Sequence, residues 1–201
     1  MTGGWAVVAG RPPRVPCVRP PADLILRISD AVLDRSDPSQ PMPDWQLTLA
    51  TLLLVLSANA APALIALLVR SLPGGRRMPP LDGGRCLVDG RRALGSSKTW
   101  PGLGAALVAT TGCAMLLGLP WSIGLGVGAA AMTGDLIASL VKRRIGLASG
   151  SPAPLLDQVP ESMLPALLVG LDWIETAIVV AAFVAIDLLL TPLFKRLASR
   201  S

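Results

Sequence analysis

The feature that most constrains this chain is a series of long apolar runs separated by basic loops. Residues 47–69, 102–119, 121–141 and 174–194 carry few charges, and each is near the ~20 residues that a helix needs to cross a bilayer. A shorter run at 163–171 covers only about 13 Å as a helix. With 52% hydrophobic residues, 15% charged residues and a mean hydropathy of +0.59, the chain is predicted to be an all-α polytopic membrane protein.

The basic residues predict how these runs are oriented. Beyond residue 44, every Lys and Arg lies in the loop 70–100, at 142–144 or after residue 194. These three segments share one side of the membrane only if the short run 163–171 also crosses it. The positive-inside rule makes that side cytoplasmic. We therefore expect about five transmembrane helices, with the N-terminus outside and with both basic loops and the C-terminus in the cytoplasm.

Residues 1–44 differ from the rest of the chain. They are rich in Pro and Arg, most densely at 11–16 and 19–21, and they contain no long apolar run. Proline interrupts helices, and the longest apolar stretch near the start is too short for a signal peptide. We expect a disordered or surface-lying tail that precedes a membrane domain at 45–201.

The composition excludes several kinds of chemistry. The chain has no His and no Tyr, and its three cysteines show no C-x-x-C spacing, so neither a zinc site nor a disulfide framework is indicated. The net charge of +5 does not indicate nucleic acid, because the cations lie between apolar runs, where they set topology or bind phosphates. Acid–base and metal chemistry must therefore rest on Asp, Glu, Lys and Arg.

A carboxylate within the third long run is the strongest indication of a site. Asp135 lies about 10 Å of helix before the three cations at 142–144. On a helix, Asp135, Ser139 and either Lys142 or Arg143 project from one face. An acid at that depth needs a partner, and a metal ion with nearby phosphates would supply one. This face is predicted to be one wall of a nucleotide site at the cytoplasmic membrane surface.

The loops on the same side supply further charged groups. Residues 94–99 combine Gly, Ser, Lys and Thr just before an apolar run, a composition that favours anion binding although the Walker spacing is missing. The predicted cluster consists of Asp82, Asp89, Asp135, Asp157, Arg91, Arg92, Lys98, Lys142 and Arg143. Carboxylates with Lys and Arg, without His or Cys, are suited to Mg²⁺ and polyphosphate. The alternative is that the protein is a non-catalytic transporter or scaffold, in which these charges only set the membrane topology. Asp135 argues against this alternative, because a buried acid contributes nothing to topology.

Three ordered blocks resemble a known family. They are Asp89-Gly90-Arg91-Arg92-x-Leu94-Gly95-x-x-Lys98-Thr99-Trp100, Gly134-Asp135-x-x-x-Ser139-x-x-Lys142-Arg143-Arg144-x-Gly146, and Leu156-Asp157-Gln158. With these blocks, the chain from about residue 45 onward resembles CDP-archaeol synthase and the bacterial proteins akin to it, within the phosphatidate cytidylyltransferase group. Ser139-x-x-Lys142-Arg143 also matches the start of the CDP-diacylglycerol synthase signature. The Pro-Gly-His-Gly-Gly element of that signature is missing, which favours the archaeol-type branch.

The resemblance implies a five-helix enzyme of phospholipid biosynthesis with its active site on the cytoplasmic side. The implied reaction converts CTP and a lipid phosphate to a CDP-activated lipid and pyrophosphate, with Mg²⁺ as cofactor. Asp135 and Asp157 would bind the metal and, with Lys98, form the catalytic set. The implied substrate-binding residues are Asp89, Arg91, Arg92, Lys98, Thr99, Ser139, Lys142 and Arg143.

The chain departs from the family at Pro101 and over residues 1–44, which have no counterpart in it, and a second enzyme class is an alternative. Pro101 stands where the family usually has a basic residue, which removes one potential phosphate contact. A CDP-alcohol phosphatidyltransferase is a second enzyme class that combines Asp, Mg²⁺ and a CDP-lipid. That family needs D-G-x-x-A-R followed by two more aspartates, and the segment 89–94 lacks the arginine and the later pair.

Other features predict packing rather than chemistry. Gly124, Gly126 and Gly128 give the third long run a small-sided face, which favours close contact between helices. Asp187, within the last run, is expected to make a hydrogen bond between helices rather than to take part in catalysis.

Overall fold

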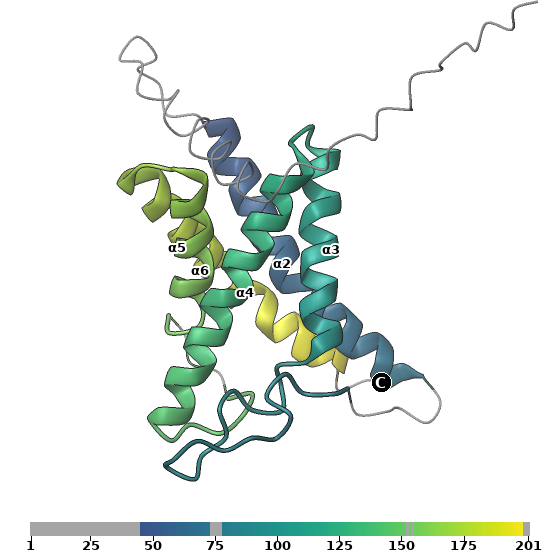
Figure 1. The fold of residues 1–201 in the computed structure, drawn as a ribbon. Coiled ribbons are helices and arrows are strands. Elements are labelled where there is room, and N and C mark those ends of the chain that lie inside the picture. The colour runs from purple at the N-terminus through teal and green to yellow at the C-terminus, as the bar shows by residue number, and fades with distance from the viewer. Residues whose placement is uncertain (1–44, 73–77, 152, 154, 199–201) are drawn as a thin grey trace, which may run out of the picture.

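The computed structural model describes residues 45–72, 78–151, 153 and 155–198, with side chains up to Leu190. The tail expected at 1–44 lies outside these residues. The described part forms five α-helices, which confirms the predicted all-α fold (Figure 1). They are α2 (Trp45–Ser71), α3 (Trp100–Leu116), α4 (Trp121–Arg144), α5 (Gln158–Val169) and α6 (Trp173–Ala198).

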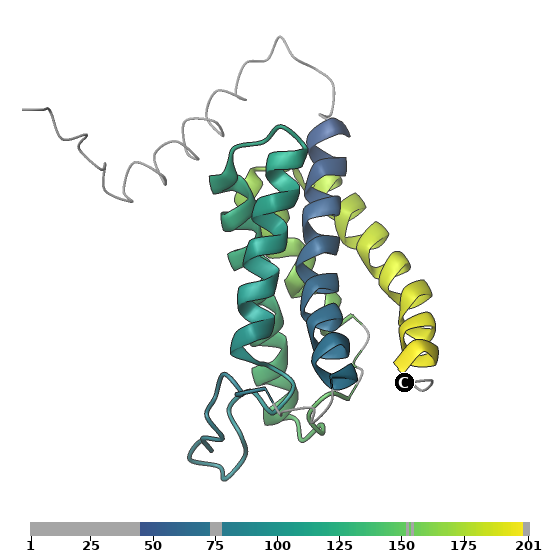
Figure 2. The same cartoon turned by 90° about the vertical axis from the view of Figure 1, so that its right-hand side faces the viewer.

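The helices alternate in direction, so the two basic loops meet at one end of the bundle (Figures 1 and 2). The ends of α2, α4 and α6 and the start of α3 all lie at the bottom of both views. The described loop residues 78–99 and 145–151 are at this end, which we call the basic end. The common placement of the two basic loops and the end of α6 agrees with the prediction from the distribution of cations.

The helices differ in their capacity to span a membrane. Three stretches are long and apolar enough, namely Trp45–Ser71, Trp121–Arg144 and Trp173–Leu190. Helix α3 is apolar but has 17 residues, and α5 has only 12, about 18 Å. The lengths of α2, α4 and α6 are those of a polytopic membrane protein.

Helix α5 is short because it begins inside the bundle. A Cβ atom on Gly134 would overlap the carbonyl oxygen of Pro160, so α4 and α5 are in backbone contact at this point. Gly134 is about 15 Å from Arg144, the last residue of α4. The chain after α4 therefore folds back into the bundle before α5 starts. Non-helical backbone at this depth is tolerated only where protein buries it or where it lines a polar cavity.

Helix α4 is the central element. In the most apolar window of each helix, 44% of α4 is buried, compared with 17% of α2 and 22% of α6. Cβ atoms on Gly124 or Gly128 would overlap Thr110 of α3, so the predicted close packing of small residues is confirmed. Phe183 of α6 packs with Val127 of α4 in the largest apolar cluster.

Exposed tryptophans mark the starts of four helices. Trp45, Trp100, Trp121 and Trp173 are the first residues of α2, α3, α4 and α6, and each exposes more than half of its surface. Tryptophan is enriched at membrane interfaces, so these side chains are suited to anchor the bundle in a bilayer. Pro101 lies in the first turn of α3, where a missing N–H removes no helical hydrogen bond.

Candidate active site

One face of α4 carries the predicted polar residues. Ser139, Lys142 and Arg143 are buried and Asp135 is half-buried, although the helix is otherwise apolar. Their spacing brings them to the side that α5 and the two loops cover. The structure thus confirms the prediction that these four residues share a face.

Lys98 is the partner of Asp135. It comes from the loop that precedes α3, and its ammonium group lies 2.5 Å from the Asp135 carboxylate. Both side chains are mostly buried, with exposed fractions of 22% for Lys98 and 17% for Asp135. The buried acid that the sequence singled out is therefore neutralised by a lysine from another element.

A second lysine–carboxylate pair lies on the same face, closer to the basic end. The Lys142 ammonium group is 2.8 Å from one Asp157 oxygen, and it donates to the other at 3.0 Å. Lys142 also donates to the carbonyl oxygen of Ser151. Asp157 occupies the N-cap position of α5 without capping that helix, so its carboxylate is used for the ion pair. The structure thus brings Asp135 and Asp157 to one side of α4, each paired with a lysine.

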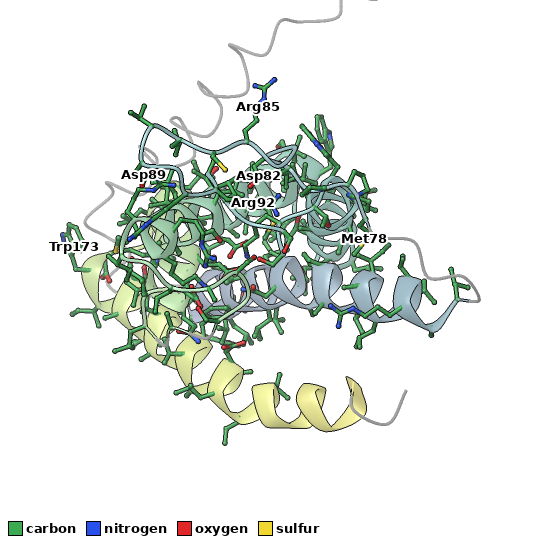
Figure 3. The ribbon with its side chains drawn as sticks, turned by 90° about the horizontal axis from the view of Figure 1, so that it is seen from below. Met78, Asp82, Arg85, Asp89, Arg92 and Trp173 are labelled. Carbon is green, nitrogen blue, oxygen red and sulfur yellow. The ribbon has the colours of Figure 1, made fainter. Side chains whose placement is uncertain are left out.

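Asp82 organises the loop between α2 and α3. Its carboxylate accepts hydrogen bonds from Arg92 at 2.7 Å and from the backbone N–H groups of Gly84, Leu94 and Gly95. Figure 3 looks onto the basic end and shows Asp82 and Arg92 together, while Arg85 points away from the bundle. Burial alone would raise the pKa of Asp82, but these hydrogen bonds outweigh it and hold the pKa well below its usual range. Asp82 and Arg92 therefore act in the loop structure.

Arginines tie the two loops together. Arg91 donates to the carbonyl oxygens of Arg143 and Arg144, at 3.2 and 2.7 Å, and so satisfies the end of α4. Arg144 forms an ion pair with Asp89 and donates to the carbonyl oxygen of Arg92. These contacts give Asp89 and Arg91, both predicted to bind substrate, a structural role in positioning the loops.

Thr99 and Arg143 also have partners within the chain. The Thr99 hydroxyl oxygen accepts from the N–H of Gly102 at 3.2 Å and caps α3. Arg143 donates to the carbonyl oxygen of Ala148 at 3.0 Å, and its Nε atom is buried without a hydrogen-bond partner among the described residues. The structure thus shows Thr99 as a helix cap and Arg143 as a contact to the loop after α4.

Two polar residues of α5, Gln158 and Glu161, were not among the predicted site residues. Gln158 donates to the Asp187 carboxylate of α6 at 2.7 Å, which confirms the predicted helix–helix hydrogen bond at Asp187. Glu161 exposes only 4% of its surface and lies near enough to Asp135, Lys98, Asp187 and Asp157 for their charges to act on it. The signal in the sequence was an acid one helical turn after Asp157, within a segment that otherwise becomes apolar.

In the described part of the chain, no three acidic or cysteine side chains come together as a ready metal site. Lys98 holds Asp135 and Lys142 holds Asp157 in ion pairs instead. The donor chemistry nevertheless fits Mg²⁺, because the groups on this face are carboxylate oxygens with no sulfur or imidazole among them. Metal binding by Asp135 and Asp157 stays a prediction.

An apolar groove of about 630 Å³ begins beside the second ion pair. Leu155 and Val159, which flank Asp157, line one end. The groove continues along α6 between Trp173 and Leu188 and is walled there mainly by Ala and Val. A charged site and an apolar groove are thus adjacent in one molecule.

Comparison with known proteins gives a consistent result. A family profile described as CarS-like CDP-archaeol synthase matches residues 118–199. The CDP-archaeol synthase of Aeropyrum pernix is 36% identical over 150 residues, which cover 69% of this chain and 82% of the relative. The enzyme of the same name from Methanopyrus kandleri is 48% identical over 104 residues, which cover 49% of this chain and 59% of the relative.

A solved structure also matches. It is described as an intramembrane enzyme for archaeal membrane lipid biosynthesis, with a TM-score of 0.61, 32% identity, and coverage of 71% of this chain and 91% of that one. Against the relatives from Methanopyrus kandleri, Methanococcus aeolicus and Hyperthermus butylicus, the chain spans 59%, 62% and 60% of their lengths. The fold, the polar face of α4 and these similarities together place the chain in the CDP-archaeol synthase family.

Proposed function

We propose that this protein is a membrane cytidylyltransferase that transfers CMP from CTP to a lipid phosphate. The observation that carries the proposal is the polar face of α4, where two lysine–carboxylate pairs lie inside an apolar bundle. Buried charges at this depth are expensive for a membrane protein and are typical of functional sites. The family to which the chain belongs supports the choice of reaction.

The chemistry requires charge neutralisation and alignment more than covalent catalysis. An oxygen of the lipid phosphate attacks the α-phosphorus of CTP. A new oxygen–phosphorus bond forms, the bond to the β-phosphate oxygen breaks, and pyrophosphate leaves. Lys98 and Lys142 are placed to exchange their carboxylate partners for phosphate oxygens and to stabilise charge that develops on the triphosphate. Arg143, the next residue on α4, would add a further positive charge near the triphosphate.

Mg²⁺ is the cofactor that fits these residues. Asp135 and Asp157 would hold it, because hard cations prefer carboxylate oxygens. When bound, the ion would neutralise the phosphate oxygens. Lys98 and Lys142, released from their carboxylates, would then face the triphosphate.

The groove between α5 and α6 supports a lipid as the second substrate. We infer that it holds one hydrocarbon chain of the lipid phosphate. From Trp173 to Leu188 the groove follows about 22 Å of helix, more than the roughly 15 Å depth of one hydrocarbon leaflet. Its end at Leu155 and Val159 would place the head group beside Asp157 and Lys142.

The positive-inside rule supports a cytoplasmic position for the basic end. The active site would then open toward cytoplasmic CTP, and the N-terminal end of α2 would lie on the outer side. Most of the cations beyond residue 44 lie at this end.

The direct test is an assay on membranes that contain the full chain. Labelled CTP is supplied with Mg²⁺ and either an ether-linked isoprenoid glycerol phosphate or phosphatidic acid. The expected result is label in the lipid fraction and release of pyrophosphate with at least one lipid, both lost on chelation of Mg²⁺. Absence of labelled lipid with both substrates, in membranes where the folded chain is present, would contradict the proposed function.

A further inference from the structure

Glu161 is a buried carboxylate that forms no ion pair and accepts no hydrogen bond at its Oε1 atom within the part of the chain that the structure describes. It lies in the first turns of α5 and exposes 4% of its surface. A buried carboxylate without a partner is strongly unfavourable, so folding alone does not account for an acid at this position.

Two acids of α6, by contrast, have hydrogen-bond partners. Glu175 exposes 7% of its surface, but it accepts a hydrogen bond from the N–H of Asp172, whose carboxylate accepts from the N–H of Glu175. This reciprocal arrangement is a capping box at the start of α6. Asp187 accepts from Gln158. Glu161 is thus distinguished from Glu175 and Asp187 by its orphaned oxygen rather than by its burial.

The packing of α4 against α5 directs Glu161 toward Asp135. A Cβ on Gly134 would lie 2.7 Å from the backbone nitrogen of Glu161, so the two helices touch beside Asp135. Asp135, Lys98, Asp187 and Asp157 are the charged groups near enough to Glu161 to act on it electrostatically. Asp157 and Glu161 are four residues apart at the start of α5, a spacing that puts them on one side of the helix. The orphaned oxygen therefore belongs to the same polar face.

We propose that Glu161 contributes a further oxygen ligand to the divalent cation that Asp135 and Asp157 would hold. The inference deepens the proposed function and rests on it. Mg²⁺ prefers carboxylate oxygens, and phosphates and water supply its other ligands. The ammonium group of Lys98 now shares the Asp135 carboxylate, and a divalent ion at Asp135 and Glu161 would take its place. Lys98 would then be free for the triphosphate, which couples metal binding to nucleotide binding.

The test measures metal binding without turnover. The full chain, purified in detergent micelles, is titrated with Mn²⁺ alone, and free Mn²⁺ is followed by electron paramagnetic resonance. Glu161→Gln is expected to weaken Mn²⁺ affinity by at least about tenfold, the lower end of what loss of a metal-site group produces. Glu175→Gln, which changes an equally buried acid used in a helix cap, is expected to bind Mn²⁺ like the wild type. Equal Mn²⁺ affinity in Glu161→Gln and the wild type would overturn the inference.

A measurement on the wild-type chain covers the case in which the variant does not fold. Dicyclohexylcarbodiimide, an apolar reagent for buried carboxyl groups, is applied with and without Mn²⁺, and modified residues are identified by mass spectrometry. Mn²⁺ is expected to protect Glu161 and not Glu175; modification of Glu161 that is insensitive to Mn²⁺ would overturn the inference. The two proposals fail separately. If Mn²⁺ binding does not depend on Glu161 but CDP-lipid forms normally, only the inference about Glu161 is wrong. If Mn²⁺ binding depends on Glu161 but no CDP-lipid forms, only the proposed reaction is wrong.

Discussion

At the residue scale, the polar groups of this protein fall into two kinds. Asp82, Arg91 and Thr99 hold loops and helix ends in place and have their hydrogen bonds satisfied within the chain. Lys98 and Asp135 instead form a pair inside the bundle, where a structural ion pair contributes little net stability. We therefore expect the first kind to serve the architecture and propose that the second serves the reaction.

Variants of Lys98 and Asp135 would distinguish an effect of the ion pair on the stability of the fold from an effect on catalysis. Asp135→Asn is expected to lower the rate of CMP transfer at least about 100-fold, as loss of a group that stabilises transition-state charge does. It should destabilise the fold by less than the ~3–5 kcal/mol of a fully buried broken pair, because the side chains remain 22% and 17% exposed. The double variant Lys98→Asp with Asp135→Lys restores the ion pair, so it should regain thermal stability in detergent but no activity. Recovery of activity in the double variant would show that the pair is structural.

The ionised Asp82 carboxylate should make the stability of the loop depend on pH. Because its pKa is lowered in the folded chain, its ionised form stabilises the loop fully above the pKa of an unfolded Asp, about 3.9. That contribution is lost as the pH falls below this value toward the lower folded pKa. Protection of the Gly84, Leu94 and Gly95 amides against hydrogen exchange, corrected for the intrinsic pH dependence of exchange, should therefore be complete at about pH 5 and fall progressively below about pH 4. Corrected protection that is independent of pH across this range would contradict the role of Asp82.

The corresponding variant provides a test at neutral pH. Asp82→Asn removes the charge that Arg92 and three backbone N–H groups share, and it should lower the free energy of loop opening by about 1–3 kcal/mol. Trypsin should then cut at Arg85 and Arg92 faster than in the wild type. The exposed side chain of Asp89 allows a matched control, since Asp89→Asn removes a more solvated ion pair and should have a smaller effect.

At the scale of elements, contact between α4 and α5 decides where the acids meet. Gly134 allows backbone contact with Pro160, and this contact places the start of α5 well inside the bundle. The segment before α5 then brings Asp157 to Lys142. The geometry of the site thus depends on one glycine that bears no functional group.

Gly134→Ala should therefore disturb the site, although Gly134 itself bears no functional group. The added methyl group overlaps the Pro160 carbonyl, and overpacking of this kind costs about 1–3 kcal/mol. We expect a lower unfolding temperature in detergent and weaker Mn²⁺ binding. Gly112→Ala in α3 is the matched control, because nothing lies within 4 Å of its new Cβ. If Gly134→Ala and Gly112→Ala are equally stable, α4 and α5 can move apart without cost, and the proposed role of Gly134 is wrong.

Filling the groove along α6 should change the KM for the lipid phosphate and not the KM for CTP. Ala181 lines the groove, and Ala181→Phe would exclude several methylene groups of a bound chain. At about 0.8 kcal/mol per methylene, two lost groups raise KM for the lipid phosphate about tenfold. KM for CTP should be unchanged. Ala129→Phe, at an exposed position of α4 outside the groove, should leave both constants unaltered; equal effects of the two variants would exclude the groove as a lipid site.

At the scale of the whole molecule, the alternating helices gather both basic loops and the end of α6 at one end (Figure 1). This arrangement is what a positive-inside topology requires. It also means that the residues of the site, which come from two loops and two helices, converge only after the bundle has formed. Sidedness can be tested with a natural label, since Cys86 is exposed in the loop at the basic end.

A membrane-impermeant maleimide should modify Cys86 in inverted membrane vesicles and not in intact spheroplasts, after Cys17 and Cys113 have been replaced by Ser. The physical reason is that the positive-inside rule places the basic end in the cytoplasm. Permeabilised spheroplasts serve as the positive control. Labelling in intact spheroplasts but not in inverted vesicles would show that the topology is the opposite of the predicted one and that the predicted site lies on the outer face.

The sequence by itself determined the fold class, the shared polar face of α4 and the gathering of cations at one end. These follow from periodicity, apolar length and charge, which are local properties of a chain in a bilayer. Partner choice was decided only by the tertiary structure. Lys98 pairs with Asp135, Arg91 caps α4, and the Glu161 Oε1 atom has no hydrogen-bond partner among the described residues. Each of these outcomes depends on how closely helices and loops approach. Close approach is set by side-chain volume at positions such as Gly134, and no pattern along the chain encodes which distant residue lies opposite.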